Sequence, residues 1–225
     1  MTMAAMPADA GTIAGMAASR QSATGGVPRR SRRNDPERRQ RIISACLDVI
    51  AERGVAGTSH RAVAARAGVP LGSMTYHFDG MDDLLHQAFD RFAQEAIDMF
   101  AGRMASVTDR DGACEAIAAH IEGDLMNTRR DVIINLELYT LAARDPAYRD
   151  ISERWMAASR ARLERFFDPV TARLLDAMIE GFTLHRAFGT PSDGAAVRDA
   201  IRRIVDDSDS RQHRHPPASY EPKMN

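Results

Sequence analysis

The chain has 225 residues, enough for one domain or two small ones with a hydrophobic core. Its 44% apolar and 27% charged residues exclude collagen-like, wholly disordered and disulfide-scaffold proteins. The net charge of −1 hides an uneven distribution, because residues 29–80 carry ten arginines against five acids and residues 81–225 carry 19 basic against 25 acidic residues. A basic first third suggests a polyanion-binding module joined to a different one.

The two ends of the chain are expected to be disordered. Residues 1–34 begin with an Ala/Gly/Ser/Thr-rich stretch and form an arm that contains arginines, and residues 208–225 form a tail. No apolar run is long enough for a membrane span or a secretory signal, so we expect a cytoplasmic protein with no membrane partner. Cys46 and Cys114 are too few for a disulfide framework or a thiolate metal site, and no metal is expected.

The start signals and apolar spacing in the first half of the chain predict four helices. Asp35-Pro36-Glu37 has the residues of a helix start, and apolar residues at three-to-four spacing continue to a stop at Gly54. Shorter helices follow at 59–67 and 70–78, and a long amphipathic helix begins near residue 81. We expect these helices to form a first domain over residues 35–98.

The second half predicts helices near 111–127, 130–143, 147–166, 169–188 and 193–206, with short separators that contain Pro or Asn. No alternation typical of a strand appears, so the fold class is all-α. Residues 99–207 are expected to form a larger helical domain.

The two short helices have the spacing of a DNA-binding helix-turn-helix over residues 59–78. Gly68 can take the left-handed conformation that ends the first helix, and Pro70 fixes the entry of the second. Leu71 and Phe78 are predicted to anchor the second helix to the core. The residues between them offer hydroxyls and an imidazole to phosphates, and Met74 or Thr75 is placed to contact a thymine methyl.

Residues 37–97 resemble the N-terminal domain of the TetR family of bacterial transcriptional regulators. The resemblance is strongest over Ala67-Gly68-Val69-Pro70-Leu71-Gly72-Ser73-Met74-Thr75-Tyr76-His77-Phe78. It implies a homodimer that binds a near-palindromic double-stranded DNA operator as a repressor and is released by a small-molecule effector, with no cofactor and no catalytic residue. The DNA contacts that it implies are Ser59, Arg61, Gly72, Ser73, Met74, Thr75, Tyr76 and His77, with Arg29, Arg30, Arg32 and Arg33 available to enter a neighbouring minor groove.

Two positions depart from the family pattern. After Tyr-His-Phe the family commonly has a lysine that contacts phosphate, whereas this chain has Asp79, which repels it. The family's usual serine before the second short helix is Pro70 here. Neither change removes the motif, and the arginines of the arm could offset the repulsion.

Polar and aromatic residues inside the apolar helical runs of residues 99–207 are candidates for an effector pocket. They are Met99, Met104, His120, Met126, Glu137, Tyr139, Trp155 and His185, together with Asn135. Glu137 stands among aliphatic residues, so it is expected to pair with an arginine of a neighbouring helix or with a cationic ligand.

The last two predicted helices carry a wide apolar arc that could form a four-helix dimer interface with a second copy. Its candidate residues are Leu174, Met178, Phe182, Val197, Ile201 and Ile204. Two other functions remain open, an all-α enzyme and a helical interaction module. The sequence contains no known metalloprotease, nucleophile-elbow, P-loop or dinucleotide motif, and an interaction module leaves the basic first third unexplained.

Overall fold

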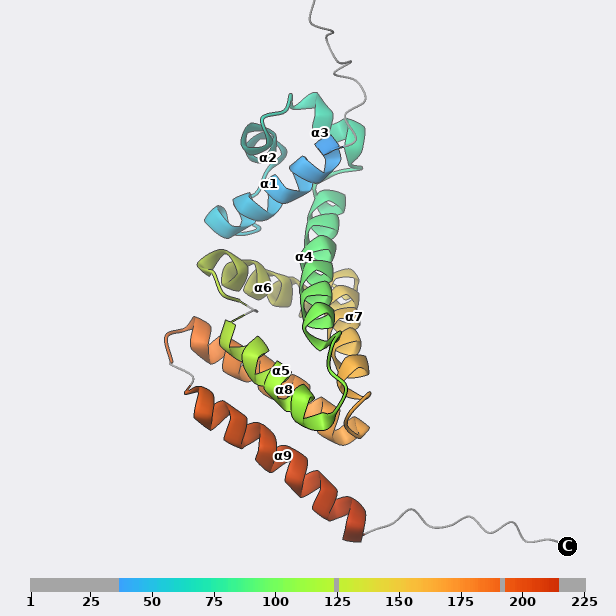
Figure 1. Cartoon of the computed structure of the whole chain (residues 1–225). Coiled ribbons are helices and arrows are strands. Elements are labelled where there is room, and N and C mark those ends of the chain that lie inside the picture. The colour runs from blue at the N-terminus through green and yellow to red at the C-terminus, as the bar shows by residue number, and fades with distance from the viewer. Residues whose placement is uncertain (1–36, 124–125, 191–192, 215–225) are drawn as a thin grey trace, which may run out of the picture. The chain divides into compact units, whose positions relative to one another are not determined.

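Nine α-helices, and no strand, make up the regular structure of residues 37–123, 126–190 and 193–214, which are the residues that the computed structural model describes (Figure 1). The all-α prediction is therefore confirmed for these residues. In chain order the helices are α1 (Glu37–Arg53), α2 (His60–Ala67), α3 (Gly72–His77), α4 (Met81–Met104), α5 (Arg110–Gly123), α6 (Arg129–Ala142), α7 (Pro146–Leu163), α8 (Pro169–Ala187) and α9 (Gly194–Arg214).

Local sequence explains where most of these helices begin. The Thr128 hydroxyl accepts the backbone N–H of Asp131 at the start of α6. Asp145 and Asp168 cap α7 and α8, and each is followed by a proline, which needs no hydrogen-bond acceptor for a backbone N–H in the first turn. These caps set the boundaries that the sequence predicts.

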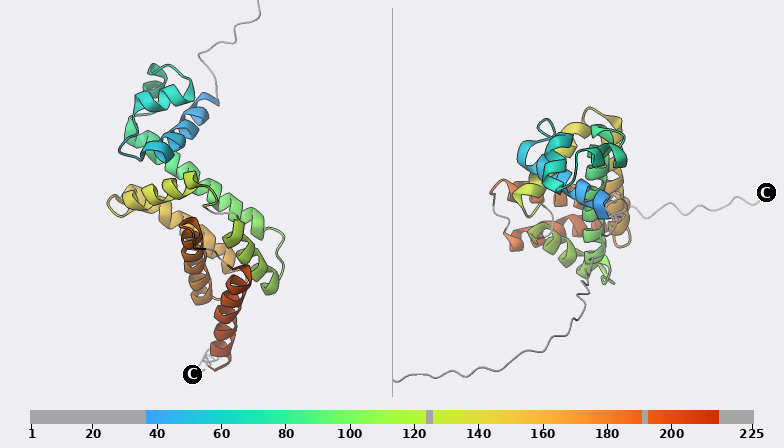
Figure 2. Two further views of the ribbon diagram at one scale, coloured as in Figure 1. Left: turned by 90° about the vertical axis from the view of Figure 1, so that its left-hand side faces the viewer. Right: turned by 90° about the horizontal axis from the view of Figure 1, so that it is seen from above.

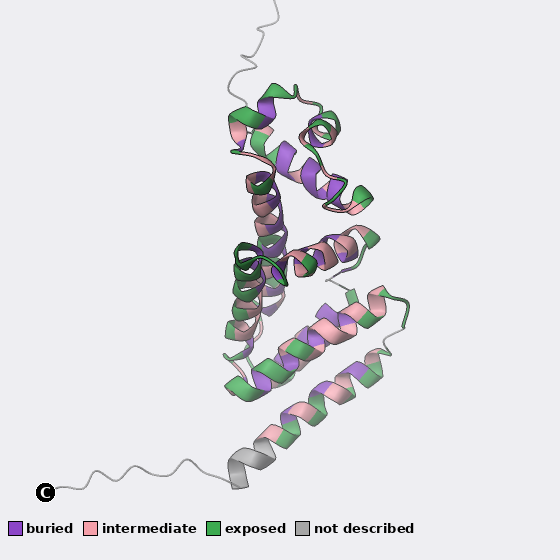
Figure 3. Cartoon of the chain, turned by 180° about the vertical axis from the view of Figure 1, so that it is seen from behind, coloured by how far each residue is buried: buried purple, intermediate pink, exposed green. Residues whose placement is uncertain are grey.

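Two hydrophobic cores lie along the chain. The first joins α1, α2 and α3 to the first half of α4, and it also includes buried residues of α6 and α7, such as Ile134 and Ile151. The second joins the end of α4 to α5, α8 and α9. The predicted domain boundary between residues 98 and 99 falls inside α4, which contributes to both cores. Figure 3 shows the buried positions along the inward sides of the helices.

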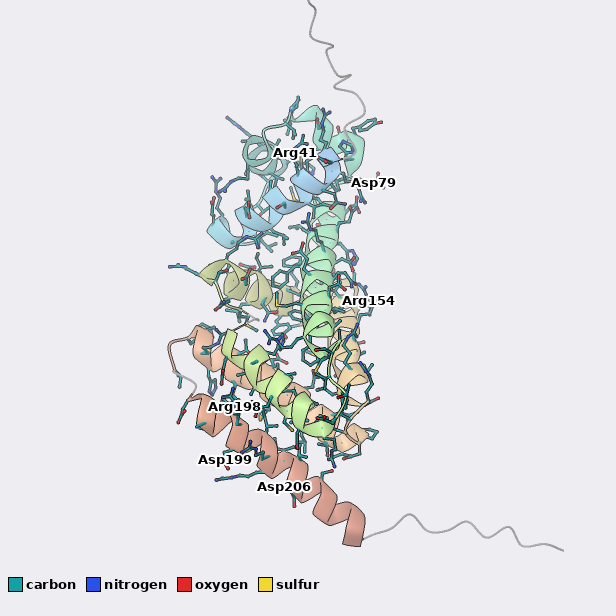
Figure 4. The ribbon with its side chains drawn as sticks, in the orientation of Figure 1. Arg41, Asp79, Arg154, Arg198, Asp199 and Asp206 are labelled. Carbon is teal, nitrogen blue, oxygen red and sulfur yellow. The ribbon has the colours of Figure 1, made fainter. Side chains whose placement is uncertain are left out.

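Charged side chains connect the helices around these cores. Arg154 of α7 pairs with Asp90 of α4 at 2.5 Å (Arg154 is labelled in Figure 4). Arg198 of α9 contacts two glutamates of α5, Glu115 and Glu122, at 2.8 Å each. The helix α9 lies beside α5 and α8 (Figures 1 and 2).

Two helix ends differ from the prediction. Helix α5 ends at Gly123 instead of residue 127, and Met126 has a positive φ of 49°. Helix α9 continues to Arg214, so residues 208–214 are helical and not part of a tail. The sequence after Gly194 has no glycine or proline before Pro216, and the Ser208 hydroxyl donates to Asp168 at 2.6 Å. The predicted arm 1–34 and residues 215–225 lie outside the described residues.

Candidate nucleic-acid interface and ligand cavity

The turn between α2 and α3 has the geometry that the sequence predicts. Gly68 ends α2 in the left-handed conformation, with φ 63°, and its backbone N–H donates to Ala64 and Ala65. The Ser73 N–H donates to the Pro70 carbonyl at 2.9 Å, which starts α3 directly after the turn. The helix α3 is thereby fixed against α2 as the second helix of a helix-turn-helix.

The side chains that hold α3 in place differ in part from the predicted ones. Phe78 is buried, as expected, but the second anchor is Met74, which is 0% exposed, whereas Leu71 is 55% exposed. Met74 and Ser73 are therefore wrong as DNA-contacting side chains, because both face the core. A helix of six residues is less than two turns long, so its apolar pattern does not show which side is buried.

The outer side of α3 carries the remaining predicted contacts. Tyr76 is 76% exposed, Gly72 and Thr75 are exposed, and His77 is half-buried. A Cβ at Gly72 would meet nothing within 4 Å, so the backbone is open to close approach there. This side offers a hydroxyl, a phenol and an imidazole to a ligand.

The helix α2 contributes a shallow groove with basic side chains. Ser59 caps α2 by accepting the Ala62 N–H at 3.3 Å, and it remains exposed. Arg61 and Arg53, both exposed, line the groove beside it. Arginines that point outward beside an exposed helix are the usual contacts to phosphate oxygens.

Arginines near the start of α1 lie close to α3, and the sequence analysis did not select them. The Arg39 guanidinium lies 5.8 Å from the centre of the Phe78 ring. Partial burial, together with the charges of Arg38 and Arg39, lowers the pKa of His77. Arg41 lies on α1 and the exposed Asp79 follows α3 (both labelled in Figure 4). The run of arginines at 38, 39 and 41 is the sequence feature that could have identified these basic side chains. The predicted contacts at Arg29, Arg30, Arg32 and Arg33 lie outside the described residues.

A cavity with about 530 Å³ of empty space, part of it open to solvent, lies among the helices of the second half of the chain. Four of the predicted pocket residues line it, namely His120, Met126, Tyr139 and Trp155. Its other lining residues are Ile97, Phe100, Met156, Ala158, Ser159, Arg162, Asp176, Ile179 and Glu180. Phe100 and His120, whose ring centres lie 4.8 Å apart, contribute aromatic rings to the wall together with Tyr139 and Trp155.

The other predicted pocket residues lie elsewhere. Met99 and His185 are exposed, and Met104 is fully buried in the second core. Asn135 is buried beside the cavity, where its amide donates to the Met126 sulfur at 3.7 Å. Periodicity identified apolar helix faces here, but not which of those faces surround an empty space.

Glu137 has no arginine partner among the described residues, and it does not line the cavity. It is half-buried at the contact between α6 and the end of α1, where its Oε1 lies 2.7 Å from the position that a Cβ on Gly54 would take. Neither an arginine pair nor the cavity wall accounts for it, so it is wrong as a pocket residue.

Two carboxylates, Asp176 and Glu180, and the guanidinium of Arg162 are charged groups of the cavity wall, and the sequence analysis missed all three. Burial raises the pKa of Asp176, opposed by hydrogen bonds from Ser159 and Arg160, whose Nη1 lies 3.2 Å away. Burial also raises the pKa of Tyr139, and the hydrogen bond with Glu180 raises it further. Among the described residues Glu180 has no ion pair. On α8 these acids are four residues apart, a spacing typical of a solvated face, so no sequence signal distinguished them.

The predicted dimer residues divide into two groups. Val197 and Ile201 are fully buried within the second core of their own chain, so they are wrong as interface residues. Leu174 is 51% exposed, and Met178, Phe182 and Ile204 are half-buried. Val170, one turn before Leu174, is exposed as well.

The described part of the chain offers neither a cluster of metal ligands nor a membrane-spanning helix. It contains no group of three His, Cys, Asp or Glu side chains that could hold a metal ion. In the same residues, every helix is too short or too polar to cross a membrane.

Comparison with known families gives two matches on this chain. The family described as bacterial regulatory proteins, tetR family, matches residues 42–88, which include the helix-turn-helix. The family described as tetracyclin repressor-like, C-terminal domain, matches residues 108–207, which include most of the cavity wall.

This chain aligns with solved structures of the same fold over nearly their whole length. A protein assigned as transcriptional regulator SCO7518 from Streptomyces coelicolor A3(2) is 51% identical, with a TM-score of 0.68 over 76% of this chain and 99% of that one. The multidrug binding protein EbrR, complexed with ethidium, is 37% identical, with a TM-score of 0.60 over 75% and 99% of the two chains.

A third structure, SCO1917 from Streptomyces coelicolor A3, is described as a member of the TetR family. It is 37% identical, with a TM-score of 0.62 over 76% of this chain and 99% of that one. With the two family matches and the helix-turn-helix geometry, the chain belongs to the TetR family of DNA-binding transcriptional regulators.

Proposed function

We propose that this regulator is a homodimeric repressor that an aromatic cation releases from its operator. The observation that carries the choice of effector is Glu180, a carboxylate with no ion pair among the described residues, in a cavity wall beside Tyr139 and Trp155. An aromatic cation fits this wall, because it can stack on the ring faces while the carboxylate balances its charge.

The second carboxylate is less available to a ligand. Asp176 already has Arg160 as a partner at 3.2 Å, so its charge is largely balanced within the protein. We therefore place the charge of a monovalent cation at Glu180, away from Arg162, which also lines the wall and donates to the Ala158 carbonyl. EbrR supports this choice, since its structures hold ethidium, proflavin and malachite green, which are aromatic dyes with a positive charge.

The DNA contacts that we propose are the predicted residues whose side chains or backbone are at least partly exposed. On α3 they are Gly72, Thr75, Tyr76 and the half-buried His77, and on α2 they are Ser59 and Arg61. The arginines of α1 near α3 add positive charge that offsets Asp79. In a homodimer two copies of α3 would enter successive major grooves of a near-palindromic site.

Contacts between α6 and α1 offer a route from the cavity to this face. Arg130 of α6 donates to Asp48 of α1 at 2.9 Å, and Glu137 of the same helix contacts the end of α1. Met126 and Tyr139, on either side of this stretch, line the cavity. A ligand that shifts α6 would therefore also shift α1, and α2 and α3 pack against α1.

The experiment that tests the effector uses the fluorescence of Trp155, the single tryptophan of the chain. Ethidium or proflavin is titrated into the protein, and we expect quenching that saturates. In Glu180→Gln the Kd should rise about tenfold, which corresponds to ~1.4 kcal/mol of lost charge pairing. In a mobility-shift titration the same dyes should release the wild-type protein from an operator duplex at a lower concentration than they release Glu180→Gln, because intercalation of the dye into the DNA affects both proteins equally.

The matched control is Glu153→Gln, which removes an exposed carboxylate from α7 away from the cavity wall. It should bind the dyes with the wild-type Kd. If fluorescein, which is anionic, binds as tightly as proflavin, or if Glu180→Gln leaves the Kd of both cations unchanged, the proposed effector class is wrong.

The proposed function assigns no reaction to the cavity. The relatives are described as regulators, and the serine of the cavity wall, Ser159, hydrogen-bonds the Asp176 carboxylate. We propose that the protein acts in the cytoplasm, where an operator is accessible to it.

A further inference from the structure

Leu71 is exposed although nothing in the fold requires it to be. Met74 and Phe78 anchor α3 to the first core, and both are almost completely buried. Leu71 precedes α3 and is 55% exposed, and its side chain makes no capping hydrogen bond. Packing therefore gives no reason for a large aliphatic side chain at this position, where a polar residue would be better solvated.

The position of Leu71 relates it to the other exposed residues of α3. Leu71 and Thr75 are four residues apart, and so are Gly72 and Tyr76, so the four lie on adjacent rows of one side of the helix. All four are exposed. Of the six large hydrophobic side chains that are exposed in the described residues, two, Leu71 and Tyr76, lie in this short segment. Leu71 therefore belongs to the side that faces DNA.

The chemistry of this side limits what it can recognise. Residues 71–76 carry no formal charge, so the segment has no arginine or lysine to bind a guanine edge. The apolar group that the major groove presents is the C5-methyl of thymine. Residues of the first turn of such a helix contact base edges, and the open space around Gly72 allows the backbone to come close.

We infer that Leu71 is a specificity-determining residue that contacts the C5-methyl of one thymine in each half-site of the operator. This inference rests on the proposed binding of DNA by a homodimer. The sequence analysis assigned this contact to Met74 or Thr75, and Leu71 takes the place of Met74, whose side chain is buried. Leu71 has the size and the exposure to cover one methyl group.

The test removes the methyl group from the DNA and the side chain from the protein. The wild-type protein first selects a duplex from a random pool. In synthetic copies each symmetric pair of thymines is then replaced by deoxyuridine, which lacks only the C5-methyl. A buried methyl group contributes about fourfold in affinity. Replacing the contacted pair of thymines, one in each half-site, should therefore raise the wild-type Kd about 15-fold.

The informative quantity is the ratio of Kd on the deoxyuridine duplex to Kd on the thymine duplex, measured within each variant. In Leu71→Ala this ratio should fall to within twofold of one at that pair and stay unchanged at the others. In the control Met99→Ala, which shortens an exposed side chain of α4, it should stay at the wild-type value. Thermal unfolding confirms that both variants fold.

Two results would overturn the inference while leaving DNA binding intact. In one, Leu71→Ala keeps the full penalty at every pair, so that another side chain reads the methyl group. In the other, replacing any thymine pair by deoxyuridine raises the Kd of the wild-type protein by no more than twofold. A wild-type protein that selects no sequence at all would instead contradict the proposed function itself.

Discussion

Met74 and Tyr76 show at the level of single residues how α3 separates stability from recognition. Met74 is fully buried and Tyr76 is 76% exposed, although they are two residues apart. We predict that Met74→Ala lowers the free energy of unfolding by about 2–5 kcal/mol, because it leaves a cavity in the first core. Tyr76→Ala should change it by less than about 0.5 kcal/mol and weaken operator binding instead. Urea denaturation and a binding titration measure the two effects, and equal stability of the two variants would contradict the packing of α3.

The residues that the sequence failed to place are those whose surroundings leave no local signal in the sequence. The turn glycine Gly68 was predicted correctly, because a left-handed backbone leaves a local signal. Met74 and Leu71 were exchanged, because a six-residue helix has too few turns to define its buried side. Asp176 and Glu180 were missed, because a carboxylate in a cavity wall and one in solvent have the same spacing along a helix. Local chemistry is readable in the sequence, whereas the partners across a cavity are not.

Helices were predicted more accurately than their side chains, because their ends depend on local caps. Thr128, Asp145 and Asp168 each accept a backbone N–H at the start of a helix, and the expected boundaries match within a few residues. The one large difference is the end of α9. There no glycine or proline stops the helix, and the contact from Ser208 to Asp168 depends on the packing of α9 against α8.

The cap of α8 predicts a dependence of stability on pH. Partial burial acts to raise the pKa of Asp168, but hydrogen bonds from Ser208 and Thr171 outweigh it and hold the pKa at about 2, below its ordinary 3.8. The ionised carboxylate therefore stabilises the folded state fully above about pH 4, and this contribution disappears as the pH falls through about 2. Asp168→Asn still caps the helix but does not titrate, so its unfolding free energy should fall less than that of the wild type between pH 4 and pH 2.

Urea denaturation at several pH values measures this difference. Asp145→Asn, at the cap of α7, is the matched control, because its carboxylate accepts the Ala147 N–H but lacks a contact from α9. It should follow the wild-type pH dependence more closely than Asp168→Asn does. Parallel curves for Asp168→Asn and the wild type would show that Asp168 does not contribute in this way.

At the scale of the whole molecule, the two candidate sites lie on different helices, which α4 and α6 connect. The residues proposed to contact DNA lie on α2 and α3 or directly before them, and the cavity is lined from α4 to α8. The helix α4 contributes to both cores, and α6 contacts α1 through Arg130 and Asp48. A ligand in the cavity can therefore change the DNA-facing helices without touching them, provided that it binds one arrangement of these helices better than another.

Binding of two half-sites requires a second copy of the chain, and α8 offers the surface for it. Leu174 and Val170 are exposed one turn apart, and Ile204 of α9 lines the same groove. We predict that Leu174→Glu makes the protein monomeric, because dimerisation would bury a carboxylate without a partner. Its operator affinity should fall by at least about tenfold, since contacts to the second half-site no longer add to the first. Sedimentation analysis and a binding titration measure the oligomeric state and the operator affinity.

The control is Met99→Glu, which alters a similarly exposed side chain of α4 and should stay dimeric. A dimeric Leu174→Glu with wild-type affinity would place the interface elsewhere on the chain.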